Sequence, residues 1–596
     1  MNGKFDMKKL TLCTLIASLL ALSGCAKSQN TETATAAGQK DYPEINVIAW
    51  SDFHSAIYED KRSETEAWGG LPVWMAAVED AKGDGLSLLI DSGDMFQGAM
   101  PFNEAKGMGM VEMMNTVGLD VATFGNHEFD YGAGKKYPDS PRGAIREAVE
   151  ASNFQWVNAN ITTTADNKDP WPPENLKPYT ILQKGPYKIA LIGLDTNETP
   201  IATIAAHVEG IKFNNAAQTL TEYIPKIVAQ NPDFIIVMAH LTGTPTNLPK
   251  EGGATLTDAP FDGELAEIIA LPEDIKKHIG LIIAGHSHKS FIAYEGNLPI
   301  IENFNNGREF TTLTLAGDEK GLHIVPESIH KHFLTHKPLE VGCGEELPPL
   351  EPIDVNGKTL TPSAKGRELV LKYEKNMTHD RCEIVGCFDD AMIRNYDGED
   401  ALGNMITDAL KKHYPQADIA VQNAGGLRID MPKGKVYRET LNTLMPFDNY
   451  LYLVEMPAGD VRQLLKVSST LKHGATYVSG ITYMIEQGCT NPEDINGDGN
   501  VESWENNCLC EEILINGKPL ESNKTYKVAV SDFMFNGGDD HAGAFSHSSI
   551  IEKGPVMKSI ILDYVKGANA CFTSNGLINP DAPRIKFGSC KGKFAK

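Results

Sequence analysis

Residues 121–130 read VATFGNHEFD, an apolar run that passes directly into a cluster of polar side chains. The arrangement recurs earlier and later in the chain. The runs INVIAW (45–50), LSLLID (86–91), FIIVMA (234–239) and LIIAG (281–285) lead into Asp52 and His54, into Asp94, into His240, and into His286 and His288. Runs that are apolar throughout are typical of strands covered on both faces. Helix-like stretches lie between several of them, as at 107–117 and 216–229, so we expect an α/β sandwich from Ile45 to about Val325.

The polar clusters predict a metal site, because binding sites in open α/β sheets gather just beyond the carboxyl ends of strands. The candidate ligands are Asp52, His54, Asp94, Asn126, His240, His286 and His288. A set of His, Asp and Asn without thiolates suits Zn²⁺, Mn²⁺ or Fe²⁺, and it exceeds what one tetrahedral ion needs. Two metal ions that share a carboxylate use the whole set. Such a pair clamps a phosphoryl group and activates water, which predicts phosphate-ester hydrolysis without a protein nucleophile.

Composition limits the classes of protein to consider. The chain has 596 residues, of which 41% are apolar and 22% are charged, and its formal net charge is −25. This length predicts two or more domains, and this composition is that of a globular protein rather than a disordered one. The negative charge argues against a polymeric nucleic acid as a partner.

The first residues have the pattern of an export signal. Three lysines precede an apolar run over 10–22, which is short for a membrane span, and small residues follow it. The sequence LSGC at 22–25 resembles a bacterial lipobox, which predicts a signal peptide over 1–24 and lipidation of Cys25. The alternative is an ordinary signal peptide with a chance cysteine. Residues 25–43 are predicted to be a flexible tether. We therefore expect an exported protein that meets the membrane only through a lipid anchor, in the periplasm or at the cell surface.

Beyond Cys13 and Cys25, the cysteines all lie in the C-terminal half of the chain. They are Cys343, Cys382, Cys387, Cys489, Cys508, Cys510, Cys571 and Cys590. An even number in an exported chain predicts disulfides, although connectivity does not follow from sequence. Proximity favours Cys382–Cys387 and Cys571–Cys590. A cysteine-rich metal site is the weaker alternative, because no paired CxxC spacing is present.

A second metal-binding pattern lies at 494–505, which reads DINGDGNVESWE and matches the calcium-loop pattern D-x-[DN]-x-[DN]-G-x5-E. The expected oxygen ligands are the side chains of Asp494, Asn496, Asp498 and Glu505 and the carbonyl of Asn500. The flanking stretches ITYMIE (481–486) and CEEILI (510–515) are predicted strands, so we expect a structural Ca²⁺ rather than a calcium switch. Cys489 and Cys508 bracket the loop and are placed to close it. The alternative is an acidic surface loop.

The chain divides into two main parts. We expect a first domain over 44–330, a linker with a connector helix over 331–379, and a second α/β domain over 380–590 with the calcium-loop insertion at 489–510. The connector helix is predicted at 361–378, where we also place a hinge between the domains.

The motifs DxH, GD, GNHEFD, a lone His and GHSH, in this order, resemble those of the calcineurin-like metallophosphoesterases. The later stretches LGNMITDA (402–409), NAGGLR (423–428), PFDN (446–449) and FMFNGGD (533–539) resemble the C-terminal domain of the 5′-nucleotidase/UDP-sugar hydrolase family. The resemblance implies an N-terminal four-layer α/β/β/α sandwich, then a helical connector and a second α/β (α+β) domain that binds the substrate.

The resemblance also implies roles for the motif residues, position by position. It assigns the first metal to Asp52, His54 and His288, the second to Asn126, His240 and His286, and the bridge between them to Asp94. His127, polarised by Asp130, stabilises the transition state or assists the leaving group. The nucleophile is water or hydroxide on the metals.

In the C-terminal domain the resemblance implies a nucleotide site. It assigns base stacking to Phe447 and Phe533, the polar edges of the nucleoside to Asn449 and Asp539, and phosphate or ribose to Asn423, Arg428 and Arg394. A guanidinium suits this role because it donates bidentately to oxyanions. Arg394 stands nine residues before Gly403, two more than the family pattern, and a second arginine usual in the family is absent. The phosphate contacts are therefore expected to be rearranged.

The implied function is that of a cell-envelope 5′-nucleotidase, with pyrophosphate hydrolysis of UDP-sugars or NAD as an additional activity. The alternative within the same class is a 2′,3′-cyclic-nucleotide 2′-phosphodiesterase with 3′-nucleotidase activity. The alternative of another class is a calcium-binding surface scaffold or adhesion lipoprotein, which has no need for a complete set of metal ligands. The expected partner is a small nucleotide, and the sequence leaves monomer and dimer open.

Overall fold

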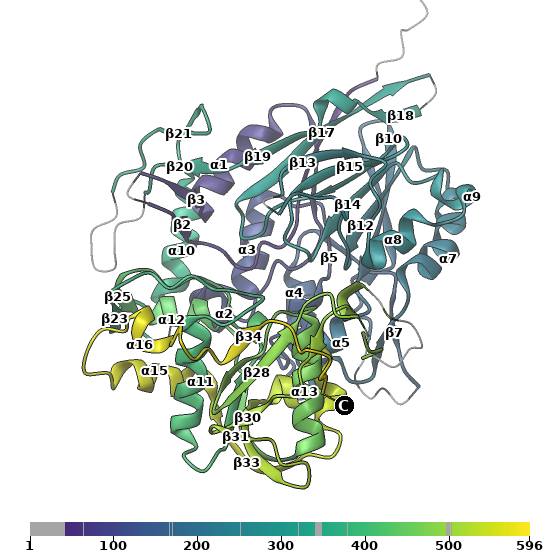
Figure 1. Ribbon diagram of the computed structural model, residues 1–596. Helices are drawn as coiled ribbons and strands as arrows, with labels where there is room; N and C mark the ends of the chain where they lie inside the picture. The colour runs from purple at the N-terminus through teal and green to yellow at the C-terminus, as the bar shows by residue number, and fades with distance from the viewer. Residues whose placement is uncertain are drawn as a thin grey trace, which may run out of the picture. The chain divides into compact units, whose positions relative to one another are not determined.

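Two mixed β-sheets pack against each other in the first half of the chain (Figure 1). The computed structural model describes residues 42–595, apart from 64, 166, 168, 170, 251, 320, 340–347, 378, 491, 496–500 and 502. In strand order, the first sheet consists of β18 (Gly321–Ile324), β17 (Glu309–Asp318), β1 (Ile45–Trp50), β4 (Leu86–Asp91), β5 (Val121–Thr123), β6 (Gln155–Val157) and β8 (Leu176–Lys177), with β19 (His330–Phe333) beside β17. The second consists of β13 (Ala254–Thr257), β15 (Phe291–Glu295), β16 (Leu298–Glu302), β14 (Leu281–Gly285), β12 (Phe234–His240), β10 (Tyr187–Asp195) and β9 (Tyr179–Lys184).

Side chains alternate along these strands between an inner and an outer core. In β1, Val47 shares the core between the two sheets with Ile236 of β12, whereas Ile48 and Trp50 belong to the outer core of the first sheet. The helices on that outer face are α1 (Leu71–Lys82), α3 (Met108–Val117) and α4 (Gly143–Ala151), and those on the outer face of the second sheet are α7 (Ala216–Val228), α8 (Gly263–Ile269) and α9 (Glu273–Lys276). The predicted four-layer α/β/β/α sandwich is confirmed, with α3 and α7 at the predicted helical stretches.

The strands that precede the polar clusters run parallel within each sheet. β1, β4 and β5 are neighbours in the first sheet, and β10, β12 and β14 are neighbours in the second. Asp195 at the end of β10 stands opposite His240 at the end of β12. The carboxyl ends of these strands, and the loops that follow them, therefore meet at one edge of the sandwich.

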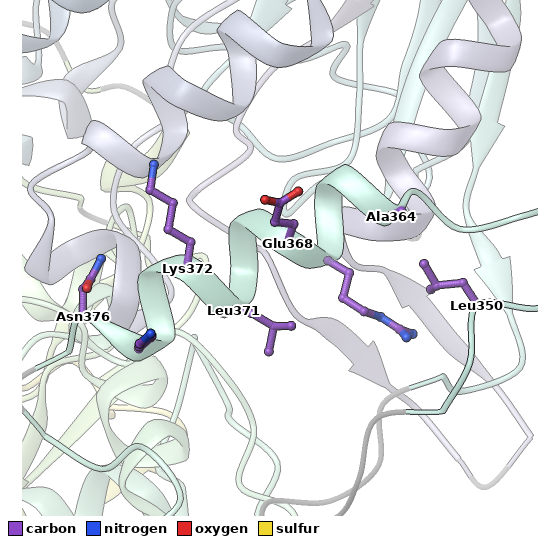
Figure 2. A pocket seen from close by; sticks show the side chains of 8 residues that line it. Leu350, Ala364, Glu368, Leu371, Lys372 and Asn376 are labelled. Carbon is purple, nitrogen blue, oxygen red and sulfur yellow. The ribbon is translucent and has the colours of Figure 1, made fainter.

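The connector helix α10 (Ala364–Lys375) packs against α1 and α3 of the first half. Tyr58 Oη donates to Glu374 over 2.8 Å, and Lys372 Nζ donates to Glu112 over 2.6 Å. A surface hollow of about 580 Å³ lies along this helix, where Leu350 and Leu371 contribute to its lining (Figure 2). None of the residues that line the hollow belongs to the predicted metal or nucleotide sites.

A separate sheet organises the second half. Its strand order is β27 (Tyr477–Ser479), β24 (Ile419–Gln422), β32 (Thr525–Ser531), β26 (Tyr450–Pro457) and β33 (Ser549–Val556). Helices α11 (Ala401–His413) and α15 (Met557–Lys566) cover one face, and α13 (Ala458–Thr470) covers the other. This is the second α/β domain that the sequence predicts. Among the described residues, no helix combines the length and the apolar character that crossing a bilayer requires.

The described disulfides correct the pairing expected from proximity. They are Cys387–Cys571, Cys489–Cys508 and Cys510–Cys590. The pairs Cys382–Cys387 and Cys571–Cys590 are wrong, because β23 (Ile384–Phe388) carries Cys387 away from its neighbours in sequence. The carbonyl of Cys387 instead accepts a hydrogen bond from the Phe572 amide over 3.0 Å, which brings residue 571 alongside. The expected closure of the insertion by Cys489 and Cys508 is confirmed.

The insertion between these two cysteines leaves from one strand and returns to the same sheet. β28 (Ile481–Glu486) is the predicted ITYMIE strand, and it pairs with both β29 (Cys508–Leu509) and β30 (Leu514–Ile515). The stretch CEEILI forms a strand only at Leu514–Ile515, so the prediction for its first residues is wrong. The candidate calcium ligands Asn496, Asp498 and Asn500 lie outside the described residues.

Candidate metal centre

The loops that follow β1, β4, β5, β12 and β14 bring the predicted metal ligands to one edge of the sandwich. The backbone is left-handed, with positive φ, at Asp52, His54, Asp94, His286 and His288. This conformation is unfavourable for residues with a Cβ, and where it persists it clusters at functional sites. The loops therefore hold these side chains in a backbone conformation that residues other than glycine seldom adopt.

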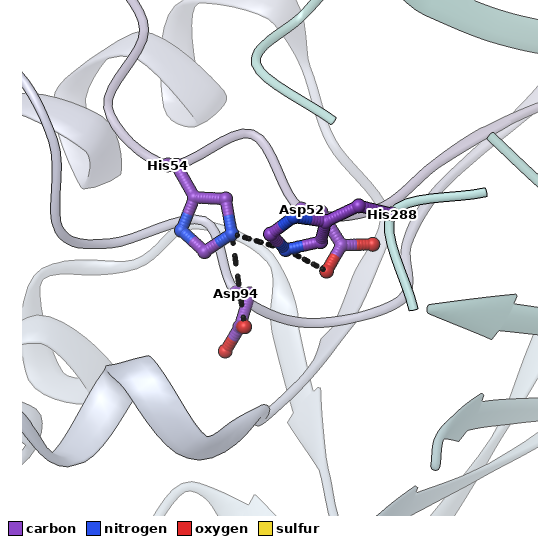
Figure 3. A group of neighbouring side chains, drawn as sticks. All are labelled: Asp52, His54, Asp94 and His288. Carbon is purple, nitrogen blue, oxygen red and sulfur yellow. Dashed lines mark hydrogen bonds and ion pairs between the residues drawn. The ribbon is translucent and has the colours of Figure 1, made fainter. Parts of the chain in front are cut away.

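Asp52, His54, Asp94 and His288 form the first group of side chains (Figure 3). The two imidazole Nε2 atoms of His54 and His288 lie 2.9 Å apart. His288 Nε2 lies 3.5 Å from Asp52 Oδ1, and His54 Nε2 lies 3.9 Å from Asp94 Oδ2. Four potential ligand atoms thus converge on one point, as the resemblance implies for the first metal together with its bridging carboxylate.

Asp94, His240 and His286 form the second group. His240 Nε2 lies 3.1 Å from Asp94 Oδ2, and His286 Nδ1 lies 2.9 Å from the side-chain oxygen of Asn126. Asp94 therefore belongs to both groups, in the position of a bridge. All seven predicted ligands are brought together.

The donor set fits two divalent cations. His240 Nε2 is fully buried and has no hydrogen-bond partner within the described residues. Burial lowers the pKa of His54 and of His288 well below the usual range and that of His286 to about 3, so these rings are neutral and present lone pairs. Burial opposes ionisation of Asp94, but attraction to His240, His127 and His54 together outweighs it and lowers the pKa of this carboxyl. The neutral rings of His54, His286 and His288 and the Asp94 carboxylate are the protonation states that metal binding requires. Burial opposes protonation of His240, but the charges of Asp94, Asp52 and Asp195 raise its pKa, so this ring releases a proton when a metal binds.

The remaining ring nitrogens of the histidines are held by the surrounding chain. His240 Nδ1 lies 2.9 Å from the carbonyl oxygen of Ser92, and His54 Nδ1 lies 3.3 Å from that of Phe96. A carbonyl acceptor fixes the proton on Nδ1 and leaves Nε2 to bind a metal. This support did not follow from sequence, because the acceptors are backbone groups without a residue signature.

His127 and Asp130 form a pair beside the metal ligands. His127 Nδ1 lies 2.6 Å from Asp130 Oδ2, and Thr203 Oγ1 donates to Asp130 Oδ1 over 2.7 Å. The His127 amide donates to Asp94 Oδ1 over 2.8 Å, which fixes this loop on the bridging carboxylate. Burial opposes protonation of His127, but attraction to Asp130 and Asp94 raises its pKa. The ring is thus oriented and stabilised in the form that can donate a proton.

Glu128 is a structural residue of the site to which sequence analysis gave no role. Its side chain is fully buried and accepts hydrogen bonds from the amides of Asp94 and Gly125, over 2.9 and 2.6 Å, and from that of Met95 over 2.9 Å. One carboxyl group therefore fastens the loop after β4 to the loop after β5. The position of Glu128 within the motif GNHEFD is the feature of the sequence that could have indicated this structural role.

Part of the predicted nucleotide site lies next to the metal centre. The ring of Phe447 is nearly parallel to that of His127, with centroids 5.8 Å apart and planes at 27°. Arg428 Cζ lies 5.8 Å from the Phe447 centroid. Further along, Asn423 Nδ2 donates to Asp539 Oδ2 over 2.7 Å. These residues from the second half form a polar and aromatic surface that reaches the metal ligands.

Other predicted substrate residues are placed differently. The guanidinium of Arg394 donates to Asp430 over 3.4 Å and to the Leu427 carbonyl over 2.6 Å, so it is already engaged within its own domain. Phe533 packs against the backbone of Gly538, where a Cβ would lie 2.4 Å from the ring. The carbonyl of Asn449 accepts from the Met557 amide over 2.8 Å.

Tyr396 is a residue of this surface that sequence analysis missed. It is 46% exposed, and the charges of Asp539 and Arg428 both act on its phenol. It lies two residues after Arg394 in sequence.

Two family models match the chain. That of the calcineurin-like phosphoesterases matches residues 45–290, and that of the 5′-nucleotidase C-terminal domain matches residues 382–547. A cell wall protein from Listeria monocytogenes is 25% identical over 94% of this chain and 71% of its own length. A 5′-nucleotidase from Vibrio cholerae is 24% identical over 94% of this chain and 96% of its own length.

Among solved structures, a 5′-nucleotidase precursor from Thermus thermophilus has the same fold. It is 18% identical, covers 91% of this chain and 99% of its own, and superimposes with a TM-score of 0.70. The range matched by the first family model contains all the predicted metal ligands, and the range matched by the second contains Arg428, Phe447 and Phe533. The chain therefore belongs to the 5′-nucleotidase family of calcineurin-like phosphoesterases and is a metal-dependent phosphoester hydrolase.

Proposed function

We propose that this protein is a cell-envelope 5′-nucleotidase, which hydrolyses nucleoside 5′-phosphates to a nucleoside and phosphate. The observation that carries the proposal is the position of Phe447, stacked on His127 with Arg428 beside it. An aromatic face and a guanidinium next to a phosphoesterase metal centre suit a substrate with a base at one end and a phosphate at the other. The aromatic face is not needed to bind a simple phosphate ester.

The residues of the first half would bind the metals and donate a proton. Asp52, His54 and His288 would hold one divalent ion (Zn²⁺, Mn²⁺ or Fe²⁺), and Asn126, His240 and His286 the other, with Asp94 between them. When bound, the metal pair supplies Lewis acidity toward the phosphoryl group and lowers the pKa of water. His127, held at Nδ1 by Asp130, keeps its other nitrogen to donate to the leaving or transition-state oxygen.

The second half supplies recognition. Arg428 orients the phosphate, Phe447 and Phe533 offer faces for the base, and Asn423 with Asp539 binds polar groups of the nucleoside. Asn449 remains a proposed contact to the base. Because Arg394 is already bound to Asp430 and to the Leu427 carbonyl, we assign it a supporting role for the 427–430 loop.

The deciding experiment is a substrate panel with the purified protein loaded with Mn²⁺ or Zn²⁺. We expect phosphate release from AMP at the highest kcat/KM, compared with UDP-glucose, NAD and 2′,3′-cAMP. A clear preference for 2′,3′-cAMP would support the cyclic-nucleotide alternative, and turnover of UDP-glucose or NAD would add pyrophosphate hydrolysis. No turnover of any compound would support the scaffold alternative. Asp94→Asn, loaded in the same way, is the control for metal-dependent turnover.

We propose further that the insertion binds a structural Ca²⁺ through Asp494 and Glu505 together with the loop between them. Glu505 is fully buried and accepts the Ile495 amide over 2.6 Å, and the Cys489–Cys508 disulfide closes the loop. Calorimetric titration of Ca²⁺ into a variant with an inactivated metal centre should show binding. Glu505→Gln should abolish that heat, and a variant that still binds Ca²⁺ equally well would exclude this site.

The N-terminal pattern supports a lipid anchor at Cys25, a residue outside the described part of the chain. Metabolic labelling with radioactive palmitate should mark the wild-type protein and not Cys25→Ser.

Because α10 is fastened to the first half, we place the hinge between the proposed domains (44–330 and 380–590) just after this helix, at 376–383. A crosslink across that segment should slow turnover.

A further inference from the structure

Lys472 connects the two halves of the chain. Its Nζ donates to Glu198 Oε1 over 3.1 Å and to Asp540 Oδ2 over 2.9 Å. Glu198 precedes α5 (Thr199–Ala202) in the first half, and 274 positions separate it from Lys472. A single ammonium group therefore holds a carboxylate of the metal-binding half and a carboxylate of the second half.

Both partners of Lys472 adjoin the proposed site. The loop that carries Glu198 leaves β10 at Asp195, which stands opposite the metal ligand His240. Asp540 follows Asp539, whose carboxylate accepts the Asn423 amide group. Lys472 thus links the loop beside the second metal group to the turn proposed to bind the nucleoside.

The turn at Asp539 and Asp540 needs external support. Both residues have a left-handed backbone, with φ of 52° and 62°, a conformation that persists only where surrounding contacts hold it. His473 Nε2 lies 2.8 Å from Asp540 Oδ2, on the same oxygen that Lys472 contacts. Burial opposes ionisation of Asp540, but hydrogen bonding to His473 and the charge of Lys472 lower its pKa, so it remains a carboxylate.

Lys472 is itself held in place. It follows Leu471, the left-handed residue that ends α13, and its Nζ lies 5.0 Å from the ring centroid of Trp504 in the insertion. Its side chain is 25% exposed. An isolated ion pair at the surface contributes little, whereas a half-buried cation shared by two carboxylates and an aromatic ring belongs to a network with larger coupling.

We propose that Lys472 is a positioning residue that, through Glu198 and Asp540, holds the nucleoside-binding turn against the metal-binding half. The proposal rests on the proposed 5′-nucleotidase function and deepens it. It predicts that Lys472 affects substrates with a nucleoside much more than small phosphate esters without one, because only the former engage the turn at Asp539.

The first test compares two substrates. Lys472→Met keeps the apolar stem against Trp504 and removes the charge. We expect its kcat/KM for AMP to fall about threefold to thirtyfold, which lies within the range that coupling within one network spans, mainly through a higher KM. Hydrolysis of p-nitrophenyl phosphate should stay at the wild-type rate. Lys472→Arg should retain most of the AMP activity. Lys226→Met, which removes an exposed pair with Glu222, is the matched control and should change neither substrate.

The second test asks whether the effect passes through the carboxylates. Glu198→Gln should lower kcat/KM for AMP in the same direction, and combining it with Lys472→Met should cost no more than Lys472→Met alone. Additive losses would overturn the proposal, as would equal losses on AMP and p-nitrophenyl phosphate.

A readout that needs no turnover separates this proposal from the function on which it rests. Hydrogen exchange of the amides in 196–203 and 536–547 should speed up in Lys472→Met and not in Lys226→Met. That result would support the link through Lys472 even if the wild-type protein failed to hydrolyse AMP. A failure to hydrolyse AMP would count against the proposed function alone. Unchanged hydrogen exchange in both segments would overturn the proposal that Lys472 links them.

Discussion

The Nε2 atoms of His54 and His288 lie 2.9 Å apart, although 234 positions separate the two residues. Burial lowers the pKa of both rings, so neither is charged. His54 carries its proton on Nδ1, which faces the Phe96 carbonyl, so its Nε2 lone pair points toward His288. His288 Nδ1 lies 2.9 Å from the side-chain amide of Asn305, whose buried Oδ1 has no partner among the described residues. Rotating that amide provides an acceptor for Nδ1–H, and two lone pairs then face each other, an arrangement that a shared cation stabilises.

Metal content tests this arrangement directly. We expect the wild-type protein to bind a pair of divalent ions per chain, and His288→Ala to retain fewer, because one of the converging nitrogens is lost. Removing the metals with a strong chelator should abolish turnover and lower the melting temperature, since the buried Asp52 and Asp94 carboxylates lose their counter-charge. Elemental analysis by mass spectrometry after dialysis measures the stoichiometry.

The control for this prediction is His323→Ala, which removes an exposed histidine. It should leave metal content and melting temperature unchanged. If His288→Ala binds as many metal ions as the wild type, the convergence of His54 and His288 does not mark a metal site.

Phe447 is the next residue to test, because its ring lies against His127 and next to Arg428. Phe447→Leu keeps apolar volume and removes the stacking face. We expect the KM for AMP to rise by an amount equivalent to roughly 1–3 kcal/mol, the value of one base–aromatic stack. The kcat for p-nitrophenyl phosphate should change little. Phe587→Leu, at an exposed phenylalanine of the same domain, is the control. Steady-state kinetics with an unchanged KM for AMP would show that the base does not stack on Phe447.

Most of the metal centre could be predicted from the sequence, because each ligand follows an apolar strand and parallel strands bring their carboxyl ends together. Asp52, Asp94 and His240 are clear examples. The same runs predict an α/β sandwich, and its four-layer form is what the family resemblance implies. The supporting contacts could not be predicted. The role of Glu128 depends on amides of a different loop, and the acceptors of His54 and His240 are carbonyl groups.

Contacts between distant segments of the chain were also beyond the sequence. The disulfide Cys387–Cys571 joins residues 184 positions apart, so proximity in sequence favoured the wrong partners. Lys472 has no motif, and its meaning depends on Glu198 of a distant loop. Arg394 matched the residue type expected for a phosphate contact, but Asp430 and a carbonyl, neither visible as partners in sequence, already bind its guanidinium.

Arg428 and Arg394 should therefore differ when mutated. Arg428 lies near Phe447 and the metal ligands, and its charge acts on His54 and His288. Arg428→Gln should raise the KM for AMP by an amount equivalent to about 1.5–3 kcal/mol, the contribution of a hydrogen bond to a charged group. Arg394→Gln should lower thermal stability through the lost contacts to Asp430 while changing this KM much less. Kinetics and calorimetry on the two variants separate binding from stability, and equal effects on KM would contradict the assignment.

The pH dependence of stability should reveal a buried carboxyl group between the two halves. Glu439, in α12 (Arg438–Leu444), accepts the Met100 amide of α2 (Met100–Glu104) over 3.3 Å, and burial raises its pKa to about 7. Because the folded protein holds this proton more tightly than the unfolded chain, the contribution of Glu439 to the free energy of unfolding is lost as pH rises from its ordinary value of 4.5 to about 7. Denaturant unfolding at several pH values measures this loss.

Glu439→Gln keeps an acceptor for the Met100 amide and removes the titration. The difference in free energy of unfolding between this variant and the wild type should grow in favour of the variant as pH rises through this window, and it should stay constant at higher pH. The reason is that the variant does not have to ionise a buried carboxyl group. Glu455→Gln, at an exposed position of β26, should follow the wild-type profile. A constant difference between Glu439→Gln and the wild type at every pH would mean that the Glu439 carboxyl has the same pKa in the folded and the unfolded protein, and that contacts across the two halves are independent of its charge.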